Sequence, residues 1–285
     1  MAAPVVVGVD DSPAAAAALS WAAGEARLRG AELVACTVVD SQRLRHPLHT
    51  LAGASGRSLA AAAGGYPVTV HRRVGEVADE LVAAGVDADL LVVGSHGRGR
   101  LAALMLGSVS RACLAHAPCP VVVVGPHTEH ATARGRVIVG VDGSAPSRQA
   151  LLAAAGEATL RGATLDIVHV VHWDRVGTEL LTPTVEELLE WGRKLVSAEL
   201  AATRVEGKTV VVHGDVSELL VRYSADADLL VLGSRGRNPA VGLLLGSTSE
   251  HCARAARCPV MVTHATGEHQ ADGQAQAVGH DELMS

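Results

Sequence analysis

The stretch Val6-Val7-Gly8-Val9-Asp10-Asp11-Ser12 decides the fold of this chain, because it returns 132 positions later as Ile138-Val139-Gly140-Val141-Asp142-Gly143-Ser144. Its apolar part is too short for a helix and is followed by turn-forming residues, so it predicts a buried strand that ends in a loop. The Ala-rich segment Ala14–Arg29 has no proline inside it and stops at Gly30, which predicts a helix with a glycine at its end. Each copy therefore opens as a strand, a loop and a helix.

The repetition extends over most of the chain. The offset of 132 holds without a gap as far as Gly30 and Gly162, and Asp87–Ser95 then matches Asp226–Ser234 at an offset of 139. A period of this length predicts two similar globular domains and not a solenoid, whose repeats are about 20–50 residues long. We expect domain 1 over residues 1–125, a linker over 126–135, domain 2 over 136–264 and a disordered tail over 265–285.

Strands and helices alternate within each copy. The first copy is expected to continue with strands at Glu32–Val39, Val68–Arg73, Leu90–Gly94 and Val121–Val124, and with helices at about Ser58–Ala63, from Glu76 and at Gly107–Ala115. The second copy repeats this, with a clear helix at Val185–Ala202. Alternation with fully apolar strands predicts an α/β fold of two tandem doubly wound five-stranded parallel sheets, Rossmann-like, with helices on both faces.

The topology of such sheets places the candidate binding site. Ligands bind beyond the carboxyl ends of the strands, at the point where the winding direction reverses. With a strand order of 2-1-3-4-5 or 3-2-1-4-5, the first strand of each copy lies at that reversal. The candidate site loops are therefore those after the first strand, with Asp10 and Asp142, and those after the fourth strand, with Gly94 and Gly233.

A glycine-rich loop follows the fourth strand of each copy and leads into a helix, with the spacing G-x2-G-x9-G-S in both. The first loop contains Gly94-Ser95-His96-Gly97-Arg98 and Gly107-Ser108-Val109-Ser110, and the second contains Gly233-Ser234-Arg235-Gly236-Arg237 and Gly246-Ser247-Thr248-Ser249. Such a loop fits phosphate, because glycines let backbone N–H groups approach, serines add donors and a helix N-terminus favours an anion. The glycines could instead only form tight turns. The spacing, kept twice while the residues between have diverged, favours a phosphate site.

These residues resemble the universal stress protein family, over essentially the whole chain as two tandem copies. The resemblance lies in V-G-V-D-x-S at the first strand, in the glycine-rich loop and in C-P-V before the fifth strand, and the loop is similar to that of the ATP-binding branch. It implies that the two aspartates hold the ribose or adenine side, that Val38 and Val170 contact adenine, and that the loops wrap the phosphates. The nucleotide-binding residues expected on this basis are Gly8, Asp10, Val38, Gly94, Ser95, Gly97, Arg98, Gly107, Ser108, Val109, Gly140, Asp142, Val170, Gly233, Ser234, Gly236, Arg237, Gly246, Ser247, Thr248 and Ser249.

Composition argues against several classes of protein. The 285 residues are 48% hydrophobic and only 2% aromatic, with no Phe and a net charge of -6. A disordered chain, a base-stacking surface for single-stranded nucleic acid and a basic DNA-binding surface are all disfavoured. No basic segment precedes a long apolar one, so we expect a cytoplasmic protein without a signal peptide or membrane span. The odd number of cysteines indicates reduced thiols, and the spacing of the two repeated pairs is not that of a zinc site.

Other residues offer weaker evidence for a metal site or for catalysis. His169 and His172 lie beside the second strand of the second copy without counterparts in the first, so a metal site shared by both copies is not expected. Trp21, Trp173 and Trp191 are expected to be packing residues. No base is paired with a serine nucleophile in both copies. We therefore assign no catalytic residue and no metal ligand.

The sequence thus predicts an ATP-binding stress-response regulator with one nucleotide site per domain, acting through ligand-dependent conformation or partner choice. ATP, with or without Mg²⁺, is the expected ligand. One alternative is a slow ATPase or phosphotransferase on the same fold, and another is an interaction module that binds a different adenine nucleotide such as cyclic AMP. The apolar fifth strands predict an edge-to-edge meeting of the two domains. We also expect a homo-oligomer of the whole chain, an unknown protein partner, and no nucleic-acid or membrane partner.

Overall fold

The computed structural model describes residues 2–40, 56–97, 105–125, 128, 134–172, 183–236 and 245–264. The elements of the first half are β1 (Val5–Gly8), α1 (Pro13–Arg29), β2 (Leu33–Asp40), α2 (Gly56–Ala62), β3 (Val68–Gly75), α3 (Val77–Ala84), β4 (Leu90–Gly94), α4 (Ser108–His116) and β5 (Val121–Val124). Those of the second half are β6 (Arg136–Gly140), α5 (Ala145–Arg161), β7 (Thr164–Val171), α6 (Val185–Thr203), β8 (Lys208–His213), α7 (Val216–Tyr223), the 3-10 turn Ser224–Asp226, β9 (Leu229–Gly233), α8 (Ser247–Ala255) and β10 (Val260–Thr263). Each half repeats the alternation expected from the sequence.

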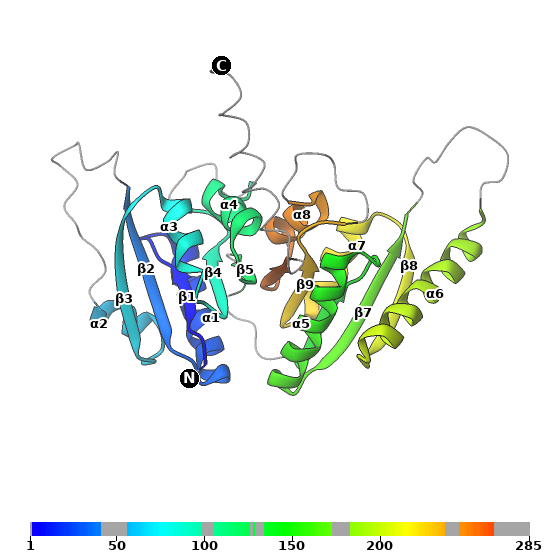
Figure 1. Ribbon diagram of the computed structural model, residues 1–285, viewed down its shortest axis with the longest axis horizontal. Helices are drawn as coiled ribbons and strands as arrows, with labels where there is room; N and C mark the ends of the chain where they lie inside the picture. The colour runs from blue at the N-terminus through cyan, green and yellow to red at the C-terminus, as the bar shows by residue number, and fades with distance from the viewer. Residues whose placement is uncertain are drawn as a thin grey trace, which may run out of the picture.

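The strands form one 10-stranded sheet in the order β3-β2-β1-β4-β5-β10-β9-β6-β7-β8 (Figure 1). Neighbouring strands are parallel within each half, and the pair β5–β10 is antiparallel. Each half therefore has the strand order 3-2-1-4-5, one of the two expected, and the doubly wound α/β fold is confirmed. Strands β1 and β6 lie where the winding reverses, so the loops after them adjoin those after β4 and β9.

Helices α1 and α5 begin and end through the same local devices. The Ser12 hydroxyl oxygen accepts a hydrogen bond from the Ala15 N–H at 3.2 Å, and a proline stands in the first turn. Gly30 ends α1 at φ 61°, a left-handed conformation that glycine adopts without strain. Ser144 and Gly162 do the same for α5. Both helices therefore start directly beyond the first strand of their half.

Small aliphatic side chains fill the core on both faces of the sheet. Val7 of β1 packs in one buried cluster with Ala18 and Ala22, which lie on α1. Leu91 of β4 and Leu114 of α4 belong to the cluster on the other face. Because alanine adds so little bulk, α1 and α5 lie close to the strands, with tight contacts between α1 and the end of β4 and between α5 and the end of β9.

The two halves join through β5 and β10. Residues Val121–Val123 pair with Val260–Val262 in antiparallel register, and all of these side chains are buried. The structure thus has the edge-to-edge meeting expected of the fifth strands. On the surface beside this junction, Arg111 of α4 lies 3.5 Å from Glu250 of α8. The outer strands of the joined sheet are β3 and β8.

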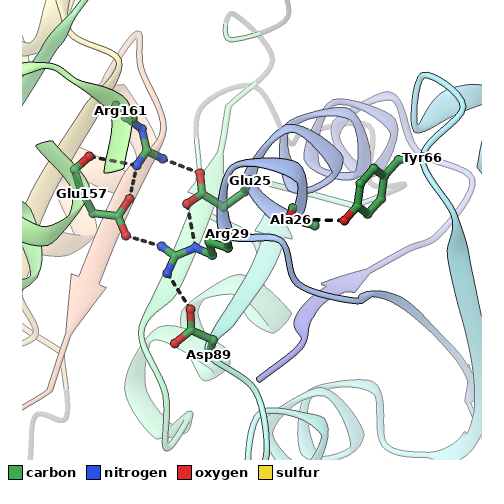
Figure 2. A network of polar contacts seen from close by, with 7 residues as sticks. All are labelled: Glu25, Ala26, Arg29, Tyr66, Asp89, Glu157 and Arg161. Atoms are coloured by element: carbon green, nitrogen blue, oxygen red, sulfur yellow. Dashed lines mark hydrogen bonds and ion pairs between the residues drawn. The ribbon is translucent and has the colours of Figure 1, made fainter. Parts of the chain in front are cut away.

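Four charged side chains join the last turns of α1 and α5, and Figure 2 shows them from close by. Arg29 contacts Glu25 of its own helix at 2.8 Å and Glu157 of the other half, and Arg161 contacts both carboxylates in the same manner. The Glu25 side chain is 1% exposed and that of Glu157 is 7% exposed. Burial raises the pKa of the Glu25 carboxyl, against the opposing effect of Arg161 and Arg29. We call these four residues the charge ring.

The matching aspartates Asp89 and Asp228 hold different partners. Asp89 accepts a hydrogen bond from Arg29 of the charge ring at 2.5 Å. Asp228 instead accepts from the backbone N–H groups of Arg134 at 2.7 Å and Arg136 at 2.9 Å. The second aspartate therefore fixes the chain as it enters β6, and the two copies have diverged where the halves are connected.

The five cysteines are buried free thiols. Burial raises the pKa of Cys113, Cys252 and Cys258 to about 12 and that of Cys119 to about 11, and it also raises the pKa of Cys36. Because the thiolate is the reactive form, we expect iodoacetamide at pH 8 to leave the folded protein unlabelled and to label five sites in urea. Mass spectrometry of the intact protein measures this. Fast labelling of any thiol under native conditions would contradict it.

Two sequence expectations fall mainly outside this structure. Most of the expected linker at 126–135 and the whole tail at 265–285 lie beyond the described residues. Within the described residues, no helix combines the length and the apolar character needed to cross a membrane.

Candidate functional site

A cavity of about 700 Å³ opens beyond the carboxyl ends of β6, β7 and β9 in the second half. It lies where the topology places a ligand site. The expected site residues that line it are Gly140, Asp142, Val170, Gly233, Gly236, Gly246, Ser247, Thr248 and Ser249. Ser234 is not in the lining, and Arg98 and Arg237 lie outside the described residues.

Asp142 is held in a tight turn at the mouth of this cavity. Its Oδ1 accepts hydrogen bonds from the Ser144 backbone N–H at 2.9 Å and from the Ser144 hydroxyl at 2.6 Å. Asp10 makes the same turn in the first half, where its Oδ1 accepts from the Ser12 N–H at 2.9 Å. One carboxylate oxygen of each aspartate thus builds the turn before α1 or α5 and sets the direction of the other.

The glycine-rich loop comes against this aspartate in both halves. A Cβ added at Gly236 would lie 2.9 Å from Asp142 Oδ2, and one added at Gly97 would lie 3.4 Å from Asp10 Oδ2. Both loops thus bring their second glycine next to the carboxylate, and at Gly236 a side chain would crowd Asp142. Each aspartate and glycine that approach one another belong to the same half of the chain.

The helices after these loops begin without a side-chain cap. Gly107 and Gly246 are the N-cap residues of α4 and α8, and neither can offer an acceptor to the first-turn N–H groups. The Gly107 N–H donates to the Ser95 carbonyl at 2.8 Å, and the Gly246 N–H donates to the Ser234 carbonyl at 2.7 Å, which closes both loops alike. The helix N-terminus at Ser247 lines the cavity, where its N–H groups and partial positive charge suit an anion.

The first glycine of each loop has a packing reason of its own. A Cβ at Gly233 would lie 2.6 Å from the Pro146 carbonyl carbon, and one at Gly94 would lie 2.8 Å from that of Ala14. The glycines in the first strands, Gly8 and Gly140, are similarly crowded by leucine side chains. Close packing therefore accounts for glycine at these positions, whatever the loops bind, and this is a different reason from the tight turns considered in the sequence analysis.

Four serines of the two motifs, Ser95, Ser110, Ser234 and Ser249, are buried, whereas Ser108 and Ser247 are exposed. Ser110 and Ser249 donate their hydroxyls to the carbonyls of Gly94 and Gly233, both at 2.6 Å, so they tie α4 and α8 to the strand ends. Ser234 is fully buried, and its hydroxyl has no hydrogen-bond partner among the residues that the structure describes. Among the first-half residues, Val38 and Val109 are half-buried, and Ser108 is exposed.

Sequence reasoning missed one wall of the cavity. Helix α6 lines it with Leu188, Trp191 and Leu195, and His169 of β7 and His172, directly after β7, also line it. Trp191 is 57% exposed, so the expectation that it packs in the core is wrong. Trp21 does pack partly buried against the core of the first half, and Trp173 lies outside the described residues. The spacing of 188, 191 and 195 indicates one apolar helix face, but it does not distinguish a cavity wall from a core-facing surface.

His169 is fixed by the backbone next to Asp142. Its Nδ1–H donates to the Val141 carbonyl at 2.6 Å, and the ring is buried. A Cβ at Gly192 would lie 2.8 Å from His169 Cδ2, so α6 lies directly against this ring. A close contact with a buried ring therefore helps to set the position of α6 beside the cavity.

Comparisons with known proteins agree with this architecture. The sequence profile of the Universal stress protein family matches residues 1–125 and 133–264. A universal stress protein of Mycobacterium tuberculosis is 34% identical over 288 residues, covering 90% of this chain and 95% of the relative. One of Mycolicibacterium smegmatis is 34% identical over 284 residues, covering 90% and 96%. The crystal structure of a universal stress protein from Archaeoglobus fulgidus has a TM-score of 0.66 at 22% identity, over 92% of this chain and 96% of that chain, and shares the fold.

Proposed function

Because this chain belongs to the universal stress protein family, we propose that each half binds an adenine nucleotide, that this nucleotide is ATP, and that the chain acts as a regulator. One observation carries the proposal. In both halves, the aspartate after the first strand and the second glycine of the loop after the fourth strand face each other beside an uncapped helix N-terminus. The carboxylate can accept hydrogen bonds from sugar hydroxyls, and the helix N-terminus can bind phosphate. Both groups lie at the carboxyl ends of the strands, as a nucleotide site requires.

The residues of the second half fit such a ligand. The cavity of about 700 Å³ lies within the range of small-molecule sites. Backbone N–H groups at Gly236 and Ser247 would hold phosphate oxygens, and Arg235, which also lines the cavity, would add positive charge. Asp142 would accept hydrogen bonds from ribose hydroxyls, and Val170 would pack against the base. ATP supplies the phosphate charge that this arrangement suits.

A binding role fits the carboxylates better than efficient hydrolysis. Asp10 and Asp142 are the duplicated acidic residues of the proposed sites, and phosphoryl transfer needs a water-positioning group and metal ligands beyond them. Asp215 also lines the cavity, but its Oδ1 caps α7 by accepting from the Glu218 N–H at 2.9 Å. The described residues contain no group of three or more His, Cys, Asp or Glu placed to hold a metal ion.

The test is direct. Purified protein is denatured and the released nucleotide identified, and ATP, AMP and cyclic AMP are then titrated into nucleotide-free protein by calorimetry. We expect Asp142→Ala to weaken ATP binding at the second site by about 10- to 150-fold, the loss of a hydrogen bond to a charged group. Asp142→Asn keeps an acceptor for Ser144 and controls for the turn, and Glu186→Ala controls for charge on the exposed surface.

Each result has a distinct meaning. No released nucleotide together with no binding on addition would overturn the proposal. Tighter binding of cyclic AMP than of ATP would favour the interaction module. Steady ADP release that disappears in Asp10→Ala and Asp142→Ala would favour the slow ATPase.

The remaining expectations are proposals about assembly. We propose that the whole chain forms a homo-oligomer in the cytoplasm and signals to a protein partner through its nucleotide state. ATP at 100 times its Kd would stabilise the bound conformation by about 2.7 kcal/mol, enough to change which form a partner meets. Light scattering that gives a monomer with and without ATP would remove the homo-oligomer.

A further inference from the structure

We infer that Trp191 is a base-stacking residue of the second site, and that the two nucleotide sites of the chain are therefore unequal. The inference rests on the proposed function and names a specificity residue within it. Trp191, Leu188 and Leu195 form one wall of the cavity, which we call the α6 wall. The ligand that this wall suits is a flat heterocycle such as a purine base.

Trp191 exposes an aromatic ring next to the polar cradle. More than half of its surface is open, at 57%, whereas the next residue on the helix, Gly192, is buried. Tryptophan is on average a highly buried residue, so an indole that lines a cavity and stays open to water has unused apolar surface. A ligand that covers the ring would remove that surface from water.

The scaffold behind Trp191 is rigid. At Gly192, a Cβ would lie 2.8 Å from both His169 Cδ2 and Val211 Cγ1, so α6 rests on β7 and β8 at this turn. Arg148 of α5 donates two hydrogen bonds of 2.8 Å to Glu199 further along α6. An aromatic side chain on such a helix is preorganised, and binding loses little conformational entropy there.

The α6 wall adjoins the proposed sugar end of the site. Leu195 Cδ1 lies 3.2 Å from the Cβ position of Gly143, the residue after Asp142. The glycine-rich loop and the start of α8 line the same cavity. With phosphates at that loop and ribose at Asp142, the base is the part of the nucleotide that remains for the α6 wall.

The first half offers no equivalent ring. The positions that match His169 and His172 are Thr37 and Asp40, and residues 41–65, which follow the second strand, contain no Trp, Tyr or Phe. Stacking on an aromatic ring is tolerant of base identity and strong compared with contacts to aliphatic groups. The second site should therefore bind purine nucleotides more tightly, and the first should depend on backbone and valine contacts.

The experiment isolates the second site with Asp10→Ala. In that background, Trp191→Ala should weaken ATP binding by about 5- to 100-fold, the usual effect of removing one stacking ring. Trp191→Phe should restore most of the affinity, and binding of inorganic triphosphate, which has no base, should be unchanged. Val185→Ala, an exposed position on the same helix outside the cavity lining, is the control.

Fluorescence gives a second readout. The chain has three tryptophans, so Trp21→Phe with Trp173→Phe in the Asp10→Ala background leaves Trp191 as the reporter, and ATP should quench it. Unchanged ATP affinity in Trp191→Ala, or an unquenched reporter in protein that calorimetry shows to bind ATP, would overturn this inference and leave the proposed function standing. If the parent protein binds no nucleotide at all, the proposed function falls, and the inference falls with it. Circular dichroism checks that each variant is folded.

Discussion

Glu25→Ala is expected to lower the free energy of unfolding by about 3–5 kcal/mol, measured by urea denaturation. The substitution removes one carboxylate of the charge ring, which leaves Arg161 with Glu157 as its remaining ring partner and Arg29 with Glu157 and Asp89, in a largely buried site. An uncompensated buried charge is far more costly than a lost surface pair. The two halves should therefore come apart at a lower urea concentration than in the parent protein.

Two controls make this result specific. Glu186→Ala removes an exposed carboxylate that pairs with Arg193 at 3.2 Å, and it should change stability by less than about 0.5 kcal/mol. Replacing the whole charge ring (Glu25→Leu, Glu157→Leu, Arg29→Met and Arg161→Met) should leave the free energy of unfolding almost unchanged. The buried charges have lost their hydration, as the raised pKa of Glu25 indicates, and apolar side chains do not bear this cost. A cost below 0.5 kcal/mol for Glu25→Ala would show that the charge ring does not hold the halves together.

Gly233→Ala is expected to destabilise the protein by about 1–3 kcal/mol. The new methyl would lie 2.6 Å from the Pro146 carbonyl carbon and 2.8 Å from the Ser147 nitrogen, both backbone atoms at the start of α5. Backbone cannot rotate aside as a side chain does, so α5 must move away from β9. The matched variant Gly94→Ala, with its closest atom at 2.8 Å, should show the same effect in the first half.

Gly156 of α5 provides a control for the effect of a glycine-to-alanine substitution itself. Gly156 is in the interior of α5, and nothing lies within 4 Å of its Cβ position, so Gly156→Ala should stabilise the protein by about 0.5–1 kcal/mol. Denaturant titration of the three variants compares them directly. Equal stability of Gly233→Ala and the parent would mean that the strand end and α5 are less tightly packed than the structure has them.

The fold was accessible from the sequence because its signals are local and were written twice. The Val-rich run before Asp10 and the Ala-rich helix that ends at Gly30 are set by periodicity and caps, which operate over a few residues. The strand order followed from general rules for parallel sheets down to two choices, and tertiary packing selected 3-2-1-4-5. The apolar fifth strands likewise indicated their own pairing.

What the sequence could not show depends on which segments meet. Glu25 and Arg29 are four residues apart on one helix, which is typical of an exposed surface pair, and only the approach of α5 buries them. The sequence does not show whether a glycine is needed at position 233 for phosphate binding or for close packing against α5. Trp191 in an otherwise ordinary amphipathic helix is indistinguishable from a core residue until the cavity beside it is known.

The antiparallel seam between β5 and β10 has an evolutionary consequence. Two separate subunits meet only at their concentration in solution, whereas two segments of one chain meet at the effective concentration set by their connection. In a symmetric pair, every substitution also appears twice. Fusion removes both constraints: one half can drift in ligand preference while its partner remains attached and keeps the seam closed. The equivalent aspartates Asp89 and Asp228 already differ in this way: one binds an arginine side chain, and the other binds backbone N–H groups.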